Sequence, residues 1–83
     1  MNIHTQRTAA HFRGLKFQRV RRVYSVLTHE WQSIPQIIQN MLETEGESIS
    51  TTTIKKYVWQ GDFDTLNLPI EVDQKHWRLR IKR

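Results

Sequence analysis

The sequence predicts an α+β fold in which three helices precede a C-terminal β-hairpin. Apolar residues recur at helical spacing in three successive segments between residues 16 and 60, and they alternate with basic residues between residues 76 and 82. The chain has 83 residues, which limits it to one small domain. We therefore expect residues 15–83 to form that domain, with residues 1–14 as an N-terminal arm or short helix.

The first helix is expected over residues 16–29. One apolar stripe runs along this segment at the spacing i, i+3, i+4 and i+7, and it consists of Val20, Val23, Tyr24 and Leu27. Gly14 lies before the stripe and is expected to end any short helix that begins in the arm, because glycine is a poor helix former.

The clearest helix signal covers residues 33–45. Ser33 and Gln36 have the spacing of a capping box, in which each side chain bonds the backbone N–H of the other residue. Pro35 fits the first turn, where its missing N–H is not needed, and Gly46 supplies a left-handed stop. The core-facing stripe is wide and consists of Ile34, Ile37, Ile38, Met41 and Leu42.

A third helix is expected over residues 50–60, with Ser50 as its N-cap and Gly61 as its end. Ile49 and Ile54 have the spacing of a hydrophobic staple across that cap. The face opposite the core is expected to carry hydroxyls, two amines and an indole but no acid, from Thr52, Lys55, Lys56 and Trp59.

Residues 62–67 are expected to form a loop, and residues 68–72 and 76–82 to form the two strands of the hairpin. Pro69 lacks a backbone N–H, which assigns the first strand to an edge. The second strand alternates between an apolar face and a face of three cations, Arg78, Arg80 and Lys82. Neighbouring cations on that face would lie about 7 Å apart, which suits successive phosphates of a nucleic acid.

Charge is unevenly distributed along the chain, whose formal net charge is +5. Residues 1–29 carry six basic and no acidic residues, residues 30–54 carry four acidic and no basic residues, and residues 55–83 carry seven basic and four acidic residues. Two basic ends that fold onto one face would attract a polyanion. The alternative is that these cations only solvate a small domain.

Several classes of function are not supported by the sequence. The chain has no cysteine, which excludes disulfides, thiolate metal sites and a cysteine nucleophile. Its four histidines lack metal-ligand spacing, and neither a glycine-rich phosphate loop nor a nucleophile elbow is present, so we expect no enzyme, metal or cofactor. The sequence has no apolar run near the roughly 18 residues that a membrane-spanning helix needs, and it has no secretory signal. We therefore expect a cytoplasmic protein, associated with the nucleoid if it is bacterial or phage.

The order of the expected elements resembles the winged helix-turn-helix family of DNA-binding domains. The segment SIPQIIQNMLETEGESISTTTIKKYV is similar to the helix-turn-helix core, and LPIEVDQKHWRLRIKR is similar to the wing. The resemblance covers residues 16–83 and implies that helix 50–60 enters the major groove while wing 68–82 lies on the backbone. The turn between the last two helices is longer than the tightest ones and carries three glutamates, which either repel phosphate or lie on the far side.

We therefore expect a small protein that binds double-stranded DNA as a monomer or weak dimer, such as a transcriptional or mobile-element regulator. The expected contacts lie on the third helix and the wing: Ser50, Thr51, Thr52, Thr53, Lys55, Lys56, Gln60, Lys75, His76, Arg78 and Arg80. Hydroxyls and amides bond base edges, and cations reach guanine acceptors or phosphates. For the strand arginines, an equally good alternative is a charged face that blocks edge-to-edge aggregation.

Two other functions remain open at this point. The same fold could be a protein-interaction module that docks through exposed aromatic and aliphatic side chains and the acidic middle segment; the candidates are Phe12, Leu15, Phe17, Trp31 and Trp59. Alternatively, the aromatic residues stack on bases of RNA or of single strands. For Trp59 we favour packing under the wing, and for Arg21 and Arg22 an alternative to nucleic-acid contact is pairing with the glutamates of the turn.

Overall fold

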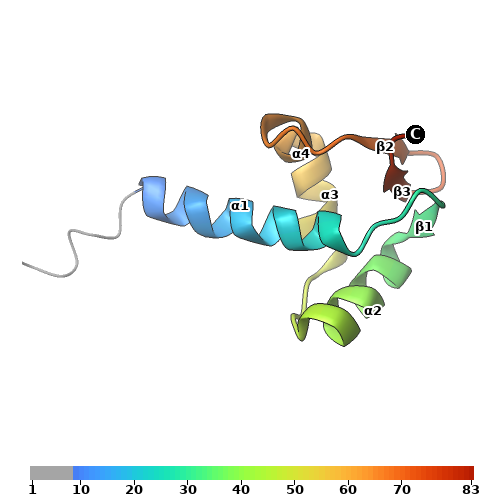
Figure 1. Ribbon diagram of the computed structural model, residues 1–83, viewed down its shortest axis with the longest axis horizontal. Coiled ribbons are helices and arrows are strands. Elements are labelled where there is room, and N and C mark those ends of the chain that lie inside the picture. Colours follow the sequence, from blue (N-terminus) through green and yellow to red (C-terminus); the bar gives the residue numbers. More distant parts are fainter. Residues whose placement is uncertain (1–8) are drawn as a thin grey trace, which may run out of the picture.

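The computed structural model describes residues 9–83, and side chains from Phe12 onward. Within these residues, four helices and three short strands follow in the order α1 (Ala9–Ser25), β1 (Gln32–Ser33), α2 (Ile34–Glu45), α3 (Thr51–Trp59), α4 (Asp62–Thr65), β2 (Ile70–Asp73) and β3 (Arg78–Ile81). The predicted α+β class is confirmed: a helical core is followed by a β-hairpin. Figure 1 shows the long α1 crossing the molecule, with α2, α3 and the hairpin gathered around its C-terminal part.

The helix α1 is longer at its N-terminal end than predicted. It begins at Ala9 and runs through Gly14, so the prediction that Gly14 ends a short helix was wrong. One glycine costs a helix only about 1 kcal/mol, which good helix formers around it can offset. At the other end α1 stops at Ser25 rather than residue 29, and the chain turns there so that Val26 and Leu27 enter the core. The predicted arm before residue 9 lies outside the described residues.

The helix α2 begins and ends as its sequence predicts. The Ser33 hydroxyl accepts a hydrogen bond from the Gln36 N–H at 3.3 Å, and the Gln36 side-chain oxygen accepts one from the Ser33 N–H at 3.0 Å. Pro35 lies in the first turn, and Gly46 follows the last turn with a left-handed φ of 63°. These local contacts fix the position of α2 along the chain before any tertiary packing is considered.

We expect Ser33→Ala to lower the free energy of unfolding by about 1 kcal/mol, because it removes the cap of α2. Urea denaturation followed by circular dichroism measures this change. Ser48→Ala is the matched control, since Ser48 is exposed in the loop before α3 and lies outside any helix. Equal losses in the two variants would contradict the role given to the cap.

A third strand joins the predicted hairpin. β1 is two residues long and pairs antiparallel with β3, so that β3 lies at the centre of a sheet in the order β1-β3-β2. The buried Gln32 side chain anchors β1 by donating to the Val26 carbonyl and accepting from the Thr28 N–H. β2 forms the other edge and directly follows Pro69, as the missing N–H of proline predicts.

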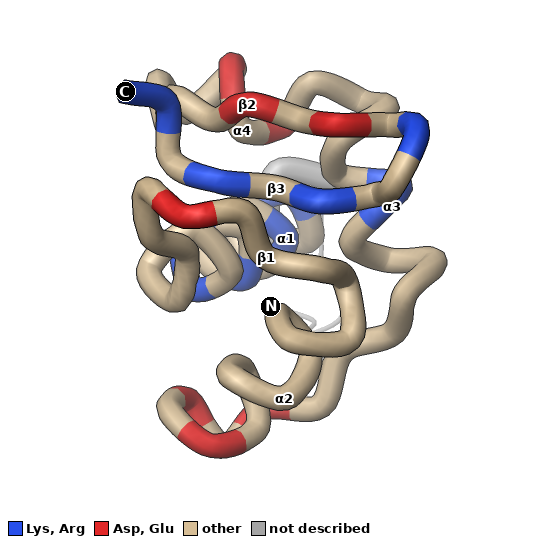
Figure 2. Tube along the Cα trace, turned by 90° about the vertical axis from the view of Figure 1, so that its right-hand side faces the viewer, with Lys and Arg blue, Asp and Glu red and all other residues tan. Residues whose placement is uncertain are grey.

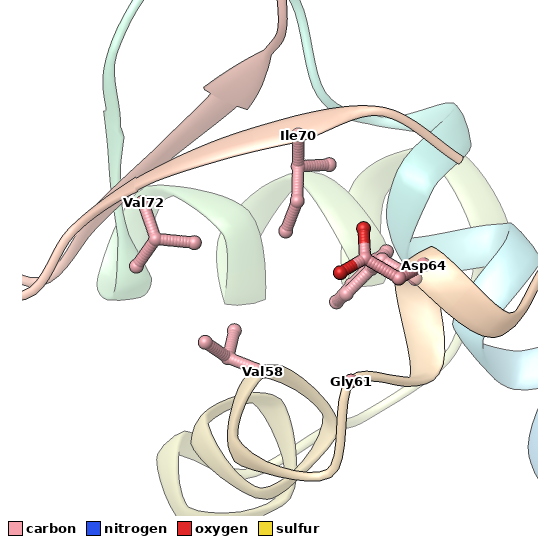
Figure 3. Close-up of a pocket in the computed structure, with 6 residues that line it drawn as sticks. Val58, Gly61, Asp64, Ile70 and Val72 are labelled. Carbon is pink, nitrogen blue, oxygen red and sulfur yellow. The ribbon is translucent and has the colours of Figure 1, made fainter. Parts of the chain in front are cut away.

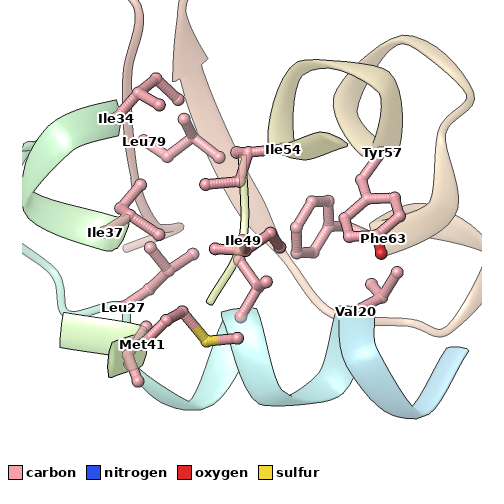
Figure 4. Packing of buried hydrophobic residues seen from close by; sticks show 12 residues of the cluster. Val20, Leu27, Ile34, Ile37, Met41, Ile49, Ile54, Tyr57, Phe63 and Leu79 are labelled. Atoms are coloured by element: carbon pink, nitrogen blue, oxygen red, sulfur yellow. The ribbon is translucent and has the colours of Figure 1, made fainter. Parts of the chain in front are cut away.

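The hydrophobic core collects side chains from α1, α2, α3, α4 and β3, as Figure 4 shows. Its fully buried members include Val20, Ile37, Ile54 and Leu79. Leu42 was predicted to belong to this core but is 57 % exposed, because it lies about 100° around α2 from the buried Met41.

Residues 62–67, predicted as a loop, contain the one-turn helix α4. Gly61 adopts a left-handed φ of 68° and redirects the chain from α3 into α4. Phe63 then points into the core, where it is only 2 % exposed. The prediction was wrong because a single turn lacks the length over which helical periodicity can be read. Within residues 9–83, no helix is long and apolar enough to cross a membrane.

Candidate nucleic-acid interface

The helix α3 buries one face and presents the other. The Ser50 hydroxyl accepts a hydrogen bond from the Thr53 N–H at 3.1 Å, so Ser50 caps the helix as predicted. Ile54 and Tyr57 are buried on the core side. Most of the predicted contact residues remain at the surface: Thr51, Thr52, Lys56 and Gln60 are exposed, and Thr53 and Lys55 are half-buried. No acidic residue occurs in α3, so its outer face is cationic.

The turn of the hairpin lies beside α3. Trp77 is the last residue of this turn and has a left-handed φ of 48°, and its ring meets the Trp59 ring edge to face with centroids 5.6 Å apart. The Lys55 amine lies 4.7 Å from the centre of the Trp77 ring. Lys75 and His76 are exposed in the same turn, and Figure 2 shows that turn next to α3. These aromatic contacts bring cations of α3 and of the hairpin to one side of the molecule.

The packing expected for Trp59 is only partly realised. Its ring does contact the hairpin through Trp77, but Trp59 remains 64 % exposed. A large exposed indole on the outer face of α3 therefore borders the cationic surface.

Arg78 and Arg80 do not form the expected row of free positive charge. The register of the hairpin places Asp73 opposite Arg78 and Glu71 opposite Arg80. The ion pairs measure 2.6 Å between Arg78 Nη2 and Asp73 Oδ2 and 3.2 Å between Arg80 Nη2 and Glu71 Oε2. Opposite charges that face each other across two strands stabilise the pairing of those strands. In Figure 2 the basic positions of β3 accordingly run alongside the acidic positions of β2.

Trp31 covers the two arginines. The Arg80 and Arg78 guanidinium carbons lie 4.3 and 5.2 Å from the centre of the Trp31 ring. Arg80 Nε is buried without a hydrogen-bond acceptor among the described residues. This agrees with the position of the Trp31 ring, which covers the guanidinium and offers it no acceptor atom. This face of the sheet is therefore occupied by its own charge pairs, and Trp31 is half-buried against them.

The carboxylates of β2 are held in their ionised form. Hydrogen bonds from Arg78 and then from His76 hold the pKa of Asp73 well below its usual range, although partial burial opposes this. A hydrogen bond from Arg80 likewise lowers the pKa of Glu71. His76 Nδ1 lies 2.9 Å from Asp73 Oδ2, so this predicted contact residue already has a partner. Both carboxylates remain charged at neutral pH and keep the arginines in place.

We expect the stability of the protein to fall as the pH drops below about 5. The unfolded chain binds a proton at Asp73 near the ordinary pKa of 3.8, whereas the folded chain resists protonation, so the stabilisation is complete above about pH 5 and is lost as the pH falls towards the lowered pKa. Urea denaturation between pH 2 and 6 measures the change. Asp73→Asn should flatten this profile, and the exposed Asp64→Asn should not. Identical profiles in wild type and Asp73→Asn would contradict the assignment.

The glutamates of the turn before α3 do not face the hairpin. Glu47 pairs with Arg22 at 2.7 Å and with Arg19 at 3.2 Å. Burial raises the pKa of Glu47, but hydrogen bonds from these two arginines outweigh it and lower that pKa. Glu43 and Glu45 lie at the C-terminal end of α2, which Figure 2 shows at the opposite end of the molecule from the hairpin turn. The expected pairing with the turn is thus found for Arg22.

A contact from α1 reaches the end of α3. Lys16 Nζ donates to Gln60 Oε1 at 2.6 Å and lies 3.1 Å from Asp62 Oδ2. Gln60 was predicted to bond base edges, but its side-chain oxygen is occupied by this contact. The separation of Lys16 and Gln60 in the sequence hides their proximity from any local pattern.

Among the described residues, no group of three histidine or acidic side chains could hold a metal ion. A hollow of about 120 Å³ between α3, α4 and β2 is lined by Val58, Phe63, Ile70 and Val72 together with Gly61 and Asp64 (Figure 3). Asp64 is the one titratable group among these lining residues, so the hollow offers no acid–base pair. Comparisons with protein-family models, curated proteins and solved structures found no match to this chain.

Proposed function

We propose that the protein binds double-stranded DNA, with α3 in the major groove and the turn between β2 and β3 on the neighbouring backbone. The observation that carries this proposal is the packing of the hairpin turn against α3, in which Trp77 of the turn contacts Trp59 and Lys55 of the helix. It joins an acid-free helix face to a cationic turn. An α-helix fits the major groove, which is about 12 Å wide, and cations beside the helix then meet the phosphates.

The exposed side chains of α3 suit contacts in the groove. The hydroxyls of Thr51 and Thr52 can both donate to and accept from base edges. Lys56 reaches guanine acceptors or a phosphate, and Lys75 contacts the backbone from the turn. In this proposal Arg78 and Arg80 are not contacts, because carboxylates and Trp31 occupy them. Their role is to hold β2 against β3, which positions the turn.

A competition experiment tests the choice of duplex DNA. A fluorescently labelled random duplex of about 20 base pairs is bound to the protein and displaced with unlabelled duplex, single strands or an RNA hairpin. The proposal expects the DNA duplex to compete best, because an A-form RNA helix has a deep, narrow major groove that side chains cannot read. Stronger competition by single strands would instead assign the exposed Trp59 to base stacking and overturn the duplex assignment.

A further inference from the structure

We infer that a hollow at the junction of α1 and α3 is a phosphate-binding pocket, which holds one phosphodiester group of the nucleic-acid backbone. This inference rests on the proposed function and adds to it a contact from α1. The hollow measures about 290 Å³ and is lined by Lys16, Thr53, Lys56, Tyr57 and Gln60. The lining side chains are two amines, two hydroxyls and one amide, and no carboxylate is among them.

Gln60 and Lys16 present hydrogen-bond donors to the hollow, whereas the Thr53 hydroxyl lies 2.8 Å from the Ser50 hydroxyl and already has a partner. Gln60 Oε1 accepts from Lys16 Nζ, which leaves the Gln60 amide nitrogen to donate. The Lys16 amine has three protons, and it contacts Gln60 Oε1 and the buried Asp62 Oδ2, the latter at 3.1 Å. Lys16 is thus anchored at the rim of the hollow and has one proton left for a ligand. An anion is the ligand that such a set of donors selects.

The Tyr57 hydroxyl is a further hydrogen-bond donor in the hollow. Burial raises the pKa of Tyr57, and the positive charge of the Arg19 guanidinium opposes this without reversing it. The hydroxyl therefore keeps its proton at neutral pH. The hydroxyl of Tyr57 lines the hollow and can donate one hydrogen bond to an acceptor there. A phosphate oxygen in the hollow supplies that acceptor.

The charges around the hollow favour an anion. Asp62 is paired with Lys16, and Glu47 is paired with Arg19 and Arg22. Lys56 forms no ion pair with any residue in the described part of the chain, so its charge is available to a ligand. An incoming phosphate therefore meets at least one uncompensated ammonium group, together with neutral donors.

The hollow lies beside the face of α3 that is proposed to enter the major groove of a duplex. Thr53, Lys56, Tyr57 and Gln60 follow the spacing i, i+3, i+4 and i+7, so they form one stripe of α3. That stripe faces Lys16 of α1, whereas Lys55 leans toward the hairpin through Trp77. The outer face of α3 is thus flanked by the pocket on one side and by the turn that carries Lys75 on the other. Phosphates on both sides of a major groove can be met at once.

The test combines two substitutions with one control. Lys56→Gln should reduce the slope of log K against log salt for a random duplex by about 0.9, the value expected for one lost phosphate contact. Lys82→Gln removes the same charge from an exposed residue near the C-terminus and should leave the slope unchanged. Tyr57→Phe removes a hydroxyl without changing charge, and it should weaken binding by about 2- to 10-fold at an unchanged slope. Thermal unfolding verifies that each variant is folded.

The outcomes separate this inference from the proposed function. If wild type binds duplex and Lys56→Gln behaves like Lys82→Gln, the pocket is rejected and the function stands. If wild type does not bind duplex, the function fails, and a titration with inorganic phosphate decides the pocket: NMR shifts at the Thr53, Tyr57 and Gln60 amides support it, and their absence rejects it. If inorganic phosphate shifts these amides in the free protein but displaces the duplex no more than chloride of equal ionic strength does, the pocket takes free phosphate and not the backbone, which overturns the backbone assignment.

Discussion

Reversing both lysines of α3, as Lys55→Glu with Lys56→Glu, is expected to reduce the affinity for duplex DNA by about 100-fold or more at 0.1 M salt. Each cation that neutralises a phosphate contributes roughly a factor of ten at that salt concentration, and a carboxylate in its place also repels the backbone. Lys55 lies beside the hairpin turn and Lys56 lines the hollow on the other side of the outer face of α3, so both substitutions fall within the proposed contact surface. Fluorescence anisotropy with a labelled duplex measures the effect.

The control is an equal charge reversal at the C-terminal end of the chain, Lys82→Glu with Arg83→Glu. Both residues are exposed, and the contact between Arg83 and Glu30 is a loose pair of 3.4 Å at the surface. We expect the control to weaken binding far less, because these residues lie outside the α3 and hairpin-turn surface. A similar loss in both double variants would show that net charge alone governs binding, and the assignment of α3 would be abandoned.

Replacing Phe63 with alanine is expected to cost about 3–5 kcal/mol of stability. Phe63 is 2 % exposed and joins α4 to the core, so its removal leaves a large cavity among Val20, Ile54 and Tyr57 (Figure 4). For a chain of this length the total stability is on the order of 4–12 kcal/mol, so this single change consumes much of it. Urea denaturation followed by circular dichroism measures the loss.

Leu42→Ala is the control for this prediction. Leu42 is 57 % exposed on α2, so we expect its truncation to change stability by no more than about 0.5 kcal/mol. If the Leu42 and Phe63 variants were equally destabilised, the division between surface and core described here would be incorrect.

The features that could be predicted from sequence are those with local causes. The capping box of Ser33 and Gln36 and the left-handed Gly46 depend on neighbours within a few residues, and α2 is found where they place it. The cap at Ser50 and the pattern of β3 are predictable for the same reason. These signals were sufficient to predict three helices, a hairpin and the exposed face of α3.

The features that were missed depend on contacts between distant segments. β1 has only two residues and exists because β3 offers it a partner, so no alternation reveals it. The free charge expected at Arg78 and Arg80 is removed by the register of the hairpin, which places Glu71 and Asp73 opposite them. That pairing could have been anticipated, because the acids and the arginines recur at the same two-residue spacing on facing strands. By contrast, nothing local links Lys16 with Gln60.

Anisotropy of a labelled random duplex, measured with the wild-type protein from 0.05 to 0.3 M salt, shows whether this surface binds DNA. The proposed surface offers Lys16, Lys55, Lys56 and Lys75 to phosphates, so we expect binding at low salt and a slope of log K against log salt of about −3 to −4. An absence of binding at 0.05 M salt, or an affinity that does not change with salt, would contradict the proposed function.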